Sequence, residues 1–285
     1  MTNNPPMRVP DEVVLDPAND PQANALAQRL LSAANDGGGE VGESPQPPIP
    51  NHSAIHVDFL VGLANPMTQE VLSTAEVREL NGEDEEHIAR GKTFADRKAR
   101  VIERGVVSLG GEPVEKDVLL ALASADREAI LLGIARATYG DTREMSLTCR
   151  SCGTEQATLV DLSAIKMVGS DDLQQTLTLK DGTEVLFHWM TGDTEKAIGK
   201  YDAKNPKATV PEMNTQLLAH LVDELNGVPF VSVNDARRLS MRQRSEILDH
   251  IAENAPGPQS QDIPHECESC GKSASLEVTF ADLFR

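Results

Sequence analysis

Four cysteines, arranged as two Cys-x-x-Cys pairs, are the residues of this chain whose type and spacing best suit a chemical role. The first pair is Cys149 and Cys152, and the second is Cys267 and Cys270. A glycine follows each pair, as in a zinc knuckle, where a tight turn lets backbone amides approach the two sulfurs. Two knuckles supply the four thiolates of a closed tetrahedral site, with zinc-to-sulfur bonds of about 2.3 Å. We therefore predict one structural Zn²⁺ ion at these four residues.

The two pairs belong to a short internal repeat. Residues 149–153 read Cys-Arg-Ser-Cys-Gly, and residues 267–271 read Cys-Glu-Ser-Cys-Gly. Each is followed by a strand-like stretch and then by Asp-Leu, at Asp161-Leu162 and at Asp282-Leu283. An ordinary zinc ribbon has both pairs within about 15–20 residues, whereas residues 154–266 intervene here. The pattern predicts a split ribbon in which the metal joins mid-chain and C-terminus.

Other roles for the cysteines stay open at this point. A redox dithiol normally begins a helix after a buried strand, where the helix dipole lowers the thiol pKa. Here a glycine and polar strand residues follow each pair. Disulfide-linked or unliganded cysteines are a further alternative, which a reducing cytoplasm disfavours. His265 could replace one ligand, although four matched sulfurs make it surplus. A catalytic zinc needs an open coordination position, and four thiolates leave none.

No other set of residues forms a recognisable catalytic site. The chain lacks a GxxxxGK[ST] phosphate loop, a GxGxxG fingerprint after a strand, an HExxH zinc motif and a GxSxG nucleophile elbow. His220 and Asp223 stand at helical spacing, and a metal-dependent hydrolase using His220, His250 and nearby acids is one alternative. The acids at 83–86 suit a helix N-terminus, whose dipole favours negative charge. We expect a protein that is not an enzyme.

The charge of the chain argues against a sequence-independent nucleic-acid binder. The formal net charge is −19, while phosphate binding needs clustered Lys and Arg. Two basic stretches, at 97–100 and 237–244, have acids nearby and suit solvated helix faces. Zinc ribbons often serve in nucleic-acid recognition, so a zinc-ribbon nucleic-acid-binding regulator is the alternative function. No window approaches the roughly 20 apolar residues of a membrane helix, and we expect a cytoplasmic protein.

We predict an α+β fold in which helices combine with short antiparallel sheets, and a split four-cysteine zinc ribbon joins mid-chain and C-terminus. Residues 1–55 are rich in proline and poor in large apolar side chains, which predicts a disordered or extended acidic arm. Residues 56–146 are predicted to form an α/β N-terminal domain. Residues 147–285 are predicted to form the split zinc-ribbon domain, with a β-hairpin and helices inserted at 154–266.

Hydrophobic periodicity and turn residues predict the elements that position the cysteines. Residues 173–190 alternate around an Asp-Gly pair, which is typical of a tight hairpin. Ser124 is expected to cap the strongest helix of the chain. Ser240 and Gln243 have the spacing of a capping box. The other predicted elements are strands at 57–61, 70–80, 145–148 and 276–280, a linker at 256–264, and helices at 84–106, 114–123, 192–203, 211–226, 234–239 and 241–253.

The order of features along residues 56–285 resembles the baseplate hub and hub-assembly proteins of tailed phages. These proteins show a strand segment, an acidic helix start, a helix with Asp-Arg that ends in Tyr-Gly, a Cys-x-x-Cys strand and an Asp-Gly hairpin. The matching residues are Glu79–Glu86, Asp126-Arg127, Tyr139-Gly140, Cys149–Cys152, Asp161-Leu162, Lys180-Asp181-Gly182, Cys267–Cys270, Phe280 and Phe284.

The resemblance implies a structural or assembly component of a phage tail baseplate hub, or of a related contractile machine. It implies other phage tail and baseplate proteins as partners, bound through a zinc-stabilised scaffold without a membrane. It leaves open a homo-oligomer within a symmetric baseplate. The implied location is the host cytoplasm during assembly and the tail baseplate of the virion.

Overall fold

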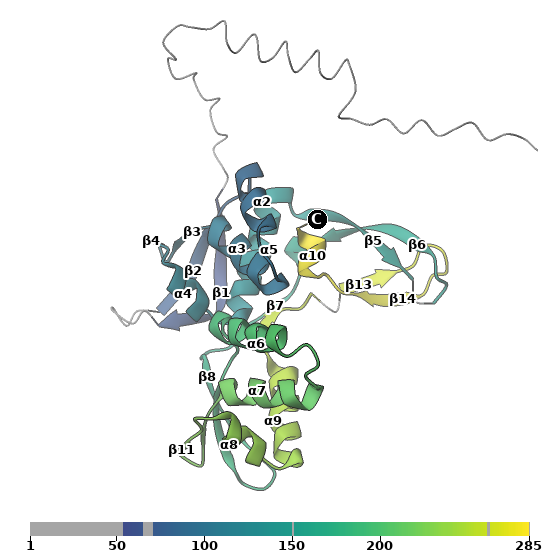
Figure 1. Cartoon of the computed structure of the whole chain (residues 1–285). Coiled ribbons are helices and arrows are strands. Elements are labelled where there is room, and N and C mark those ends of the chain that lie inside the picture. Colours follow the sequence, from purple (N-terminus) through teal and green to yellow (C-terminus); the bar gives the residue numbers. More distant parts are fainter. Residues whose placement is uncertain (1–53, 65–70, 150, 261–262, 285) are drawn as a thin grey trace, which may run out of the picture. The chain divides into compact units, whose positions relative to one another are not determined.

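The computed structural model describes residues 54–64, 71–149, 151–260 and 263–284, which belong to one compact unit spanning Asn51–Arg285. The predicted arm lies outside the described residues, apart from residues 54 and 55. The fold is α+β, as predicted, with short antiparallel sheets alternating with helices (Figure 1). No described helix is both long and apolar enough to cross a membrane.

The first four-stranded sheet is antiparallel and has the strand order β1-β2-β3-β4. Its core is aliphatic, and Val77, Ile102 and Ile130 are completely buried in it. Helix α5 packs against β1 and β2 and contributes Ala129, Ile130, Leu131 and Ile134 to this core. The elements are β1 (Ile55–Ala64), β2 (Val71–Val77), α2 (Gly82–Ala89), α3 (Phe94–Gly105), β3 (Val106–Leu109), β4 (Glu112–Pro113), α4 (Lys116–Ala121) and α5 (Ser124–Tyr139).

The second four-stranded sheet is also antiparallel and has the order β8-β9-β10-β11. Val185, Leu218 and Ile247 are completely buried in its own core. The elements are β8 (Gln174–Thr178), β9 (Glu184–His188), α6 (Gly192–Lys204), α7 (Val210–Leu221), β10 (Val222–Leu225), β11 (Val228–Pro229), α8 (Val233–Arg238) and α9 (Met241–Asn254).

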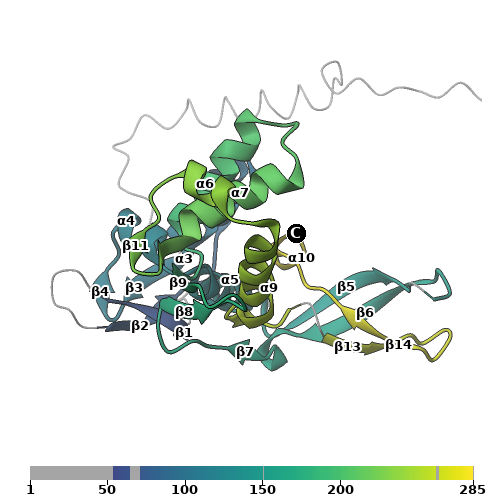
Figure 2. The ribbon, with the colours of Figure 1, turned by 90° about the horizontal axis from the view of Figure 1, so that it is seen from below.

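Two hairpins carry the cysteines at their turns, and Figures 1 and 2 show them extending side by side. A third core lies at their base, where Met145, Val160 and Leu283 pack against Leu132 of α5. The hairpins are β5 (Thr142–Thr148) with β6 (Glu155–Asp161), and β13 (Ile263–Glu266) with β14 (Ser273–Leu276). Short elements beside them are η1 (Leu162–Ala164), β7 (Met167–Val168), β12 (Gly257–Pro258) and α10 (Phe280–Leu283).

Local turn and cap chemistry gave several correct predictions. The predicted hairpin is β8 with β9, and Gly182 in its turn has a φ of 86°. Ser240 and Gln243 form the expected capping box at the start of α9. The region predicted as one interrupted helix at 84–106 consists of α2 and α3, which begin after the N-caps Asn81 and Thr93.

The helix predicted at 211–226 is wrong over its last residues. It ends at Leu221, and the next four residues form β10, which pairs with β9. Asn226 and Gly227 have φ values of 50° and 72°, as in the tight turns that join antiparallel strands. This pair therefore turns a hairpin between β10 and β11, where the sequence had indicated a helix end.

Three further predictions are corrected. Ser124 is the first residue of α5 and not its cap; the cap position is Ala123, which has no side-chain bond to offer. The strand predicted at 276–280 is wrong: the observed strand β14 ends at Leu276, and Phe280 is the first residue of α10. The predicted linker at 256–264 contains β12, which pairs with β7, and the first residues of β13.

Candidate metal centre

The four predicted cysteines lie together, although residues 153–266 separate the two pairs. Cys149 Sγ is 3.9 Å from Cys270 Sγ, and Cys152 Sγ is 3.7 Å from Cys267 Sγ. All four sulfurs are within 4.8 Å of one another, and all four cysteines are free. A tetrahedron with metal-to-sulfur bonds of about 2.3 Å has sulfurs about 3.8 Å apart, whereas a disulfide needs about 2.05 Å. The group could therefore bind one metal ion.

The same backbone contacts build both knuckles. The Gly153 amide donates to the Cys149 carbonyl over 2.8 Å, and the Gly271 amide donates to the Cys267 carbonyl over 2.8 Å. The φ values of these glycines are 73° and 65°, a conformation that is strained for residues with a Cβ. The Cys149 amide donates to the Thr154 carbonyl over 2.9 Å, and the Cys267 amide donates to the Lys272 carbonyl over 3.1 Å. The two knuckles are therefore alike in backbone structure as well as in sequence.

The surroundings of the sulfurs shift their pKa values in opposite directions. A hydrogen bond with the Thr154 hydroxyl, helped by the Thr154 backbone, lowers the pKa of Cys152 to about 6. The Lys272 amide lowers the pKa of Cys270, but desolvation and the neighbouring thiols outweigh it and raise that pKa to about 11. Four thiolates this close repel one another, so a cation favours the state in which all four are deprotonated.

Gln156 and His265 lie beside the most buried cysteine. Cys267 is 1% exposed, and its thiol donates to Gln156 Oε1 over 3.4 Å. The amide nitrogen of Gln156 contacts Nε2 of His265. His265 is not part of the four-cysteine group; it contacts Gln156, which in turn bonds to Cys267. Gln156 was not predicted from the sequence. Its position shortly after the first knuckle is the only sequence feature that connects it with the site.

The histidines considered for catalysis do not form a metal site. Among the described residues, the four cysteines are the only group of three or more candidate ligands. Asp223 pairs with His188, whose Nδ1 lies 3.0 Å from Asp223 Oδ1, and not with His220 as its spacing had indicated. His250 packs edge-on against the Phe187 ring, with centroids 5.9 Å apart. The hydrolase alternative therefore has no ligand set in the described part of the chain.

Comparison with known proteins identifies the family. The family model described as "T4 bacteriophage base plate protein" matches residues 68–284. The chain belongs to this baseplate family. The match covers both cysteine pairs and the whole second sheet, and it confirms the resemblance seen in the order of sequence motifs. No curated protein and no solved structure gives a significant match.

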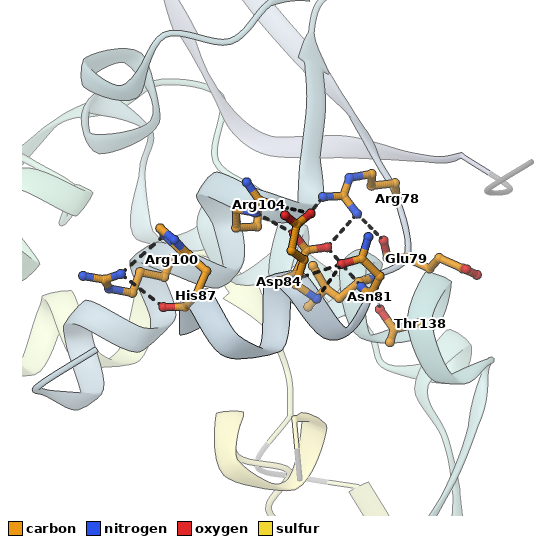
Figure 3. Close-up of polar contacts among 10 residues, drawn as sticks. Arg78, Glu79, Asn81, Asp84, His87, Arg100, Arg104 and Thr138 are labelled. Atoms are coloured by element: carbon orange, nitrogen blue, oxygen red, sulfur yellow. Dashed lines mark hydrogen bonds and ion pairs between the residues drawn. The ribbon is translucent and has the colours of Figure 1, made fainter. Parts of the chain in front are cut away.

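The acidic motif of this baseplate protein holds a buried carboxylate. Arg78 donates to both carboxylate oxygens of Asp84, over 2.8 Å and 3.0 Å, and Arg104 Nε donates over 2.5 Å (Figure 3). The backbone amide of Asn81 donates a further hydrogen bond to the Asp84 carboxylate, over 3.0 Å. Burial acts to raise the pKa of Asp84, but the bonds from Arg78, Asn81 and Arg104 together outweigh it and hold the pKa at about 2. Asp84 therefore joins α2 to α3 and to the end of β2, beyond its helix-capping role.

The Asp-Arg motif holds the baseplate protein's first strand. The Asp126 carboxylate accepts from the backbone amides of Leu60, Val61 and Gly62, over 2.5, 3.0 and 3.0 Å. Burial raises the pKa of Asp126, and these three amides oppose that effect. The bonds fall within the stretch, residues 58–63, where β1 shifts its register against β2. Asp126 thus supplies the partners that the sheet does not give these amides.

Proposed function

We propose that this protein is a structural or assembly component of the phage tail baseplate hub, with a scaffold clamped by one zinc ion. Cys149, Cys152, Cys267 and Cys270 would hold the ion. The observation that carries the proposal is the cluster of four free thiols at tetrahedral spacing, in a chain of the baseplate family. A bound Zn²⁺ supplies a closed, redox-inactive link among thiolates and no open coordination position.

The position of the cysteines supports a clamping role. The first hairpin packs at its base against Leu132 of α5 through Met145 and Val160, and Ile263 of the second hairpin packs against the same cluster. The knuckles lie at the opposite ends of the hairpins, where Cys152 and Cys270 are exposed and few apolar side chains surround the sulfurs. A metal ion would hold the hairpin ends together where packing does not. We keep the division into an N-terminal domain at 56–146 and a ribbon domain at 147–285 as part of this proposal.

The partners and location follow from family membership. Baseplate proteins act by binding other tail proteins, so we propose such proteins as partners and no turnover of a substrate. The corresponding locations are the host cytoplasm during assembly and the tail baseplate of the virion. Copurification with other baseplate proteins from infected cells tests this part, and its absence from both assembly intermediates and tails would contradict it.

Metal analysis of the purified full-length protein tests the clamp. We expect one zinc ion per chain, and we expect Cys149→Ser and Cys267→Ser each to abolish stoichiometric binding, because three thiolates leave the site open. Each variant should also lower the midpoint of thermal unfolding by about 5–15 °C, since metal binding contributes to folding free energy. Ser151→Ala, within the first knuckle, is the matched control and should keep the metal. A metal-free protein whose unfolding ignores a chelator would refute the clamp.

A further inference from the structure

The two sheets belong to two copies of one structural repeat, residues 55–164 and 174–284. Each copy contains, in order, two strands, two helices, two strands, two helices, a cysteine hairpin and an Asp-Leu pair that begins or ends a short helix. Both sheets have the strands in chain order. The elements β7 and β12 stand outside this series and pair with one another. The cysteine repeat seen in the sequence is thus one part of a much longer one.

Strand register shows that the equivalence extends to single residues. β3 pairs with β2 with a bulge that skips Val107, and β10 pairs with β9 with a bulge that skips Asp223. The turns that follow both have positive φ at two successive residues. These residues are Gly110 and Gly111 in the first copy and Asn226 and Gly227 in the second, with φ values of 57°, 86°, 50° and 72°.

A matching arginine contact joins the last two helices of each copy. Arg127 Nη1 in α5 donates to the Leu119 carbonyl of α4 over 2.7 Å. Arg244 Nη1 in α9 donates to the Ala236 carbonyl of α8 over 3.0 Å. The two bonds span the same number of residues and lie at the same place in the repeat. We use this equivalence to compare what covers each copy.

The first copy is covered by the second at the corner between α4 and α5. The Ser124 amide donates to the Met190 carbonyl over 2.7 Å, and the Gly192 amide donates to the Leu122 carbonyl over 3.1 Å. Ser124, the first residue of α5, is consequently only 8% exposed. The first turn of α6 therefore docks on this corner.

Charge and shape reinforce this contact. Glu195, in the first turn of α6, has one carboxylate oxygen 3.5 Å from Arg127 Nε and the other 3.2 Å from Lys98 Nζ. Gly192 lies so close to Arg127 that an added Cβ would be 2.8 Å from the guanidinium carbon. The contact thus requires a glycine at the start of α6 and a glutamate three residues later.

The matching surfaces at the other ends of the two copies are uncovered. Met241, the first residue of α9, corresponds to Ser124 and is 87% exposed. Gly82, the first residue of α2, corresponds to Gly192, and an added Cβ there meets nothing within 4 Å. Glu85 corresponds to Glu195 and is exposed, and its carboxylate makes no ion pair or hydrogen bond with a described residue. Within the chain, the first turn of α6 contacts the α4–α5 corner. The first turn of α2 is the equivalent of the former surface and the α8–α9 corner is the equivalent of the latter, and both are left exposed.

We propose that these two surfaces bind one another between copies of this chain, head to tail. The head is the first turn of α2, with Gly82 and Glu85, and the tail is the α8–α9 corner, with Met241 and Arg244. Glu85 of one chain would face Arg244 of the next, as Glu195 faces Arg127 within the chain.

Charge favours a second copy as the occupant. The head lies in the acidic stretch at 83–86, and the tail lies in the basic stretch at 237–244, which the metal site does not use. Arg244 bonds to carbonyl and hydroxyl oxygens and pairs with no described carboxylate. Because head and tail are different surfaces, the contact is heterologous and builds a ring if the rotation closes, or a filament if it does not.

Complementation between two blocked variants of the full-length, metal-loaded protein tests this contact. Gly82→Val blocks the head, and Met241→Glu blocks the tail; both positions are exposed, so both chains should fold as the wild type does. In analytical ultracentrifugation up to about 100 µM, well above the Kd of a micromolar interface, we expect wild-type species larger than the 30.8 kDa chain. Each variant alone should sediment as the monomer. An equimolar mixture should form a dimer, because one free head meets one free tail.

Leu159→Glu is the control, since Leu159 is 71% exposed in β6 and outside both faces; it should assemble as the wild type does. A wild-type protein that stays monomeric overturns the proposal, as does a single variant that still assembles or a mixture without dimer. If the tail binds another baseplate protein and the chain does not bind itself, the second copy is the wrong occupant. None of these outcomes depends on the zinc content, so the proposed clamp stands or falls separately.

Discussion

Three buried charged side chains each join segments that are distant in the sequence. Asp84 and Asp126 are completely buried, and Arg127 is 2% exposed. Asp84 binds two arginines, Asp126 binds three amides of β1, and Arg127 binds the end of α4 and faces α6. Burying a charge is unfavourable unless its bonds are satisfied, so each residue fixes the geometry of the segments that satisfy it.

Asp84→Asn should lower the free energy of unfolding by about 2–3 kcal/mol at neutral pH. The substitution keeps the size of the side chain but leaves Arg78 and Arg104 without their negative partner. The estimate is below that for a fully buried pair because these arginine side chains are 24% and 35% exposed. Urea denaturation of the wild type and the variant measures the difference.

The same pair of proteins should respond differently to acid. The pKa of Asp84 is about 2 in the folded chain, below the ordinary value of 3.8. A lowered pKa stabilises the fold above the ordinary value, and this contribution disappears as the pH falls through the folded pKa. The gap between wild type and Asp84→Asn should therefore narrow between about pH 4 and about pH 2. Glu86→Gln, exposed on α2, is the control; a gap that stays constant would contradict the role of Asp84.

At the scale of elements, close approach of a helix to a sheet depends on one missing side chain. A Cβ at Gly133 in α5 would lie 2.4 Å from Val57 Cγ2 in β1. Gly199 in α6 has only the Ala95 Cβ near it, at 3.9 Å. Both glycines lie within helices, but a side chain at Gly133 would clash with β1, whereas one at Gly199 has room.

Gly133→Ala and Gly199→Ala should change stability in opposite directions. Alanine improves helix propensity by about 1 kcal/mol at either position. At Gly133 the overpacking against Val57 should outweigh that gain and lower the free energy of unfolding by about 1–3 kcal/mol. At Gly199 the gain should remain, at about 0.5–1 kcal/mol. Urea denaturation of both variants decides, and a stabilised Gly133→Ala would show that α5 can move away from β1.

Elements defined by local chemistry could be predicted from the sequence, and elements defined by distant partners could not. The capping box at Ser240 and the turn at Gly182 depend on neighbouring residues, and both were predicted correctly. Residues 222–225 look like the end of a helix, and only pairing with β9 makes them a strand. Ser124 resembles a cap, but its amide bonds to a carbonyl beyond the whole helix, at Met190.

The candidate site follows the same rule. Spacing within each Cys-x-x-Cys pair drew attention to the four cysteines, and their sulfurs lie close enough together to bind one metal ion. The acids at 83–86 were correctly assigned to a helix start, but Arg104 as a partner of Asp84 was not foreseen. Partners such as Gln156 for Cys267, or Leu60 for Asp126, come from distant parts of the chain, so no local pattern connects them.

At the scale of the whole molecule, the described part of the chain combines three apolar cores with one cluster of sulfurs. One core belongs to each four-stranded sheet, and the third lies where the cysteine hairpins meet α5. No cysteine belongs to any of these cores, although Cys267 itself is buried. Loss of a metal should therefore affect the hairpins before it affects the sheets.

Hydrogen exchange of the full-length protein, with and without a chelator, measures this difference. We expect the amides of β5, β6, β13 and β14 to lose protection by roughly 10-fold or more on chelation, because local opening then needs no metal release. The amides of β2 and β9, in the middle of the two sheets, serve as the internal reference and should lose less protection, because their exchange requires the sheets themselves to open. Equal loss in all strands would show that the metal supports the global fold; no loss anywhere would show that it supports neither.

The two knuckles also determine how the backbone is connected. With a metal held by both, residues 153–266 become a closed ring fastened at one point. The turn at Asp181-Gly182 is exposed and lies inside this ring. A protease that cut there would open the ring without separating the two fragments, because the metal would still tie one to the other. A part built in this way could lose a peptide bond in its second copy and keep its N-terminal and C-terminal fragments attached.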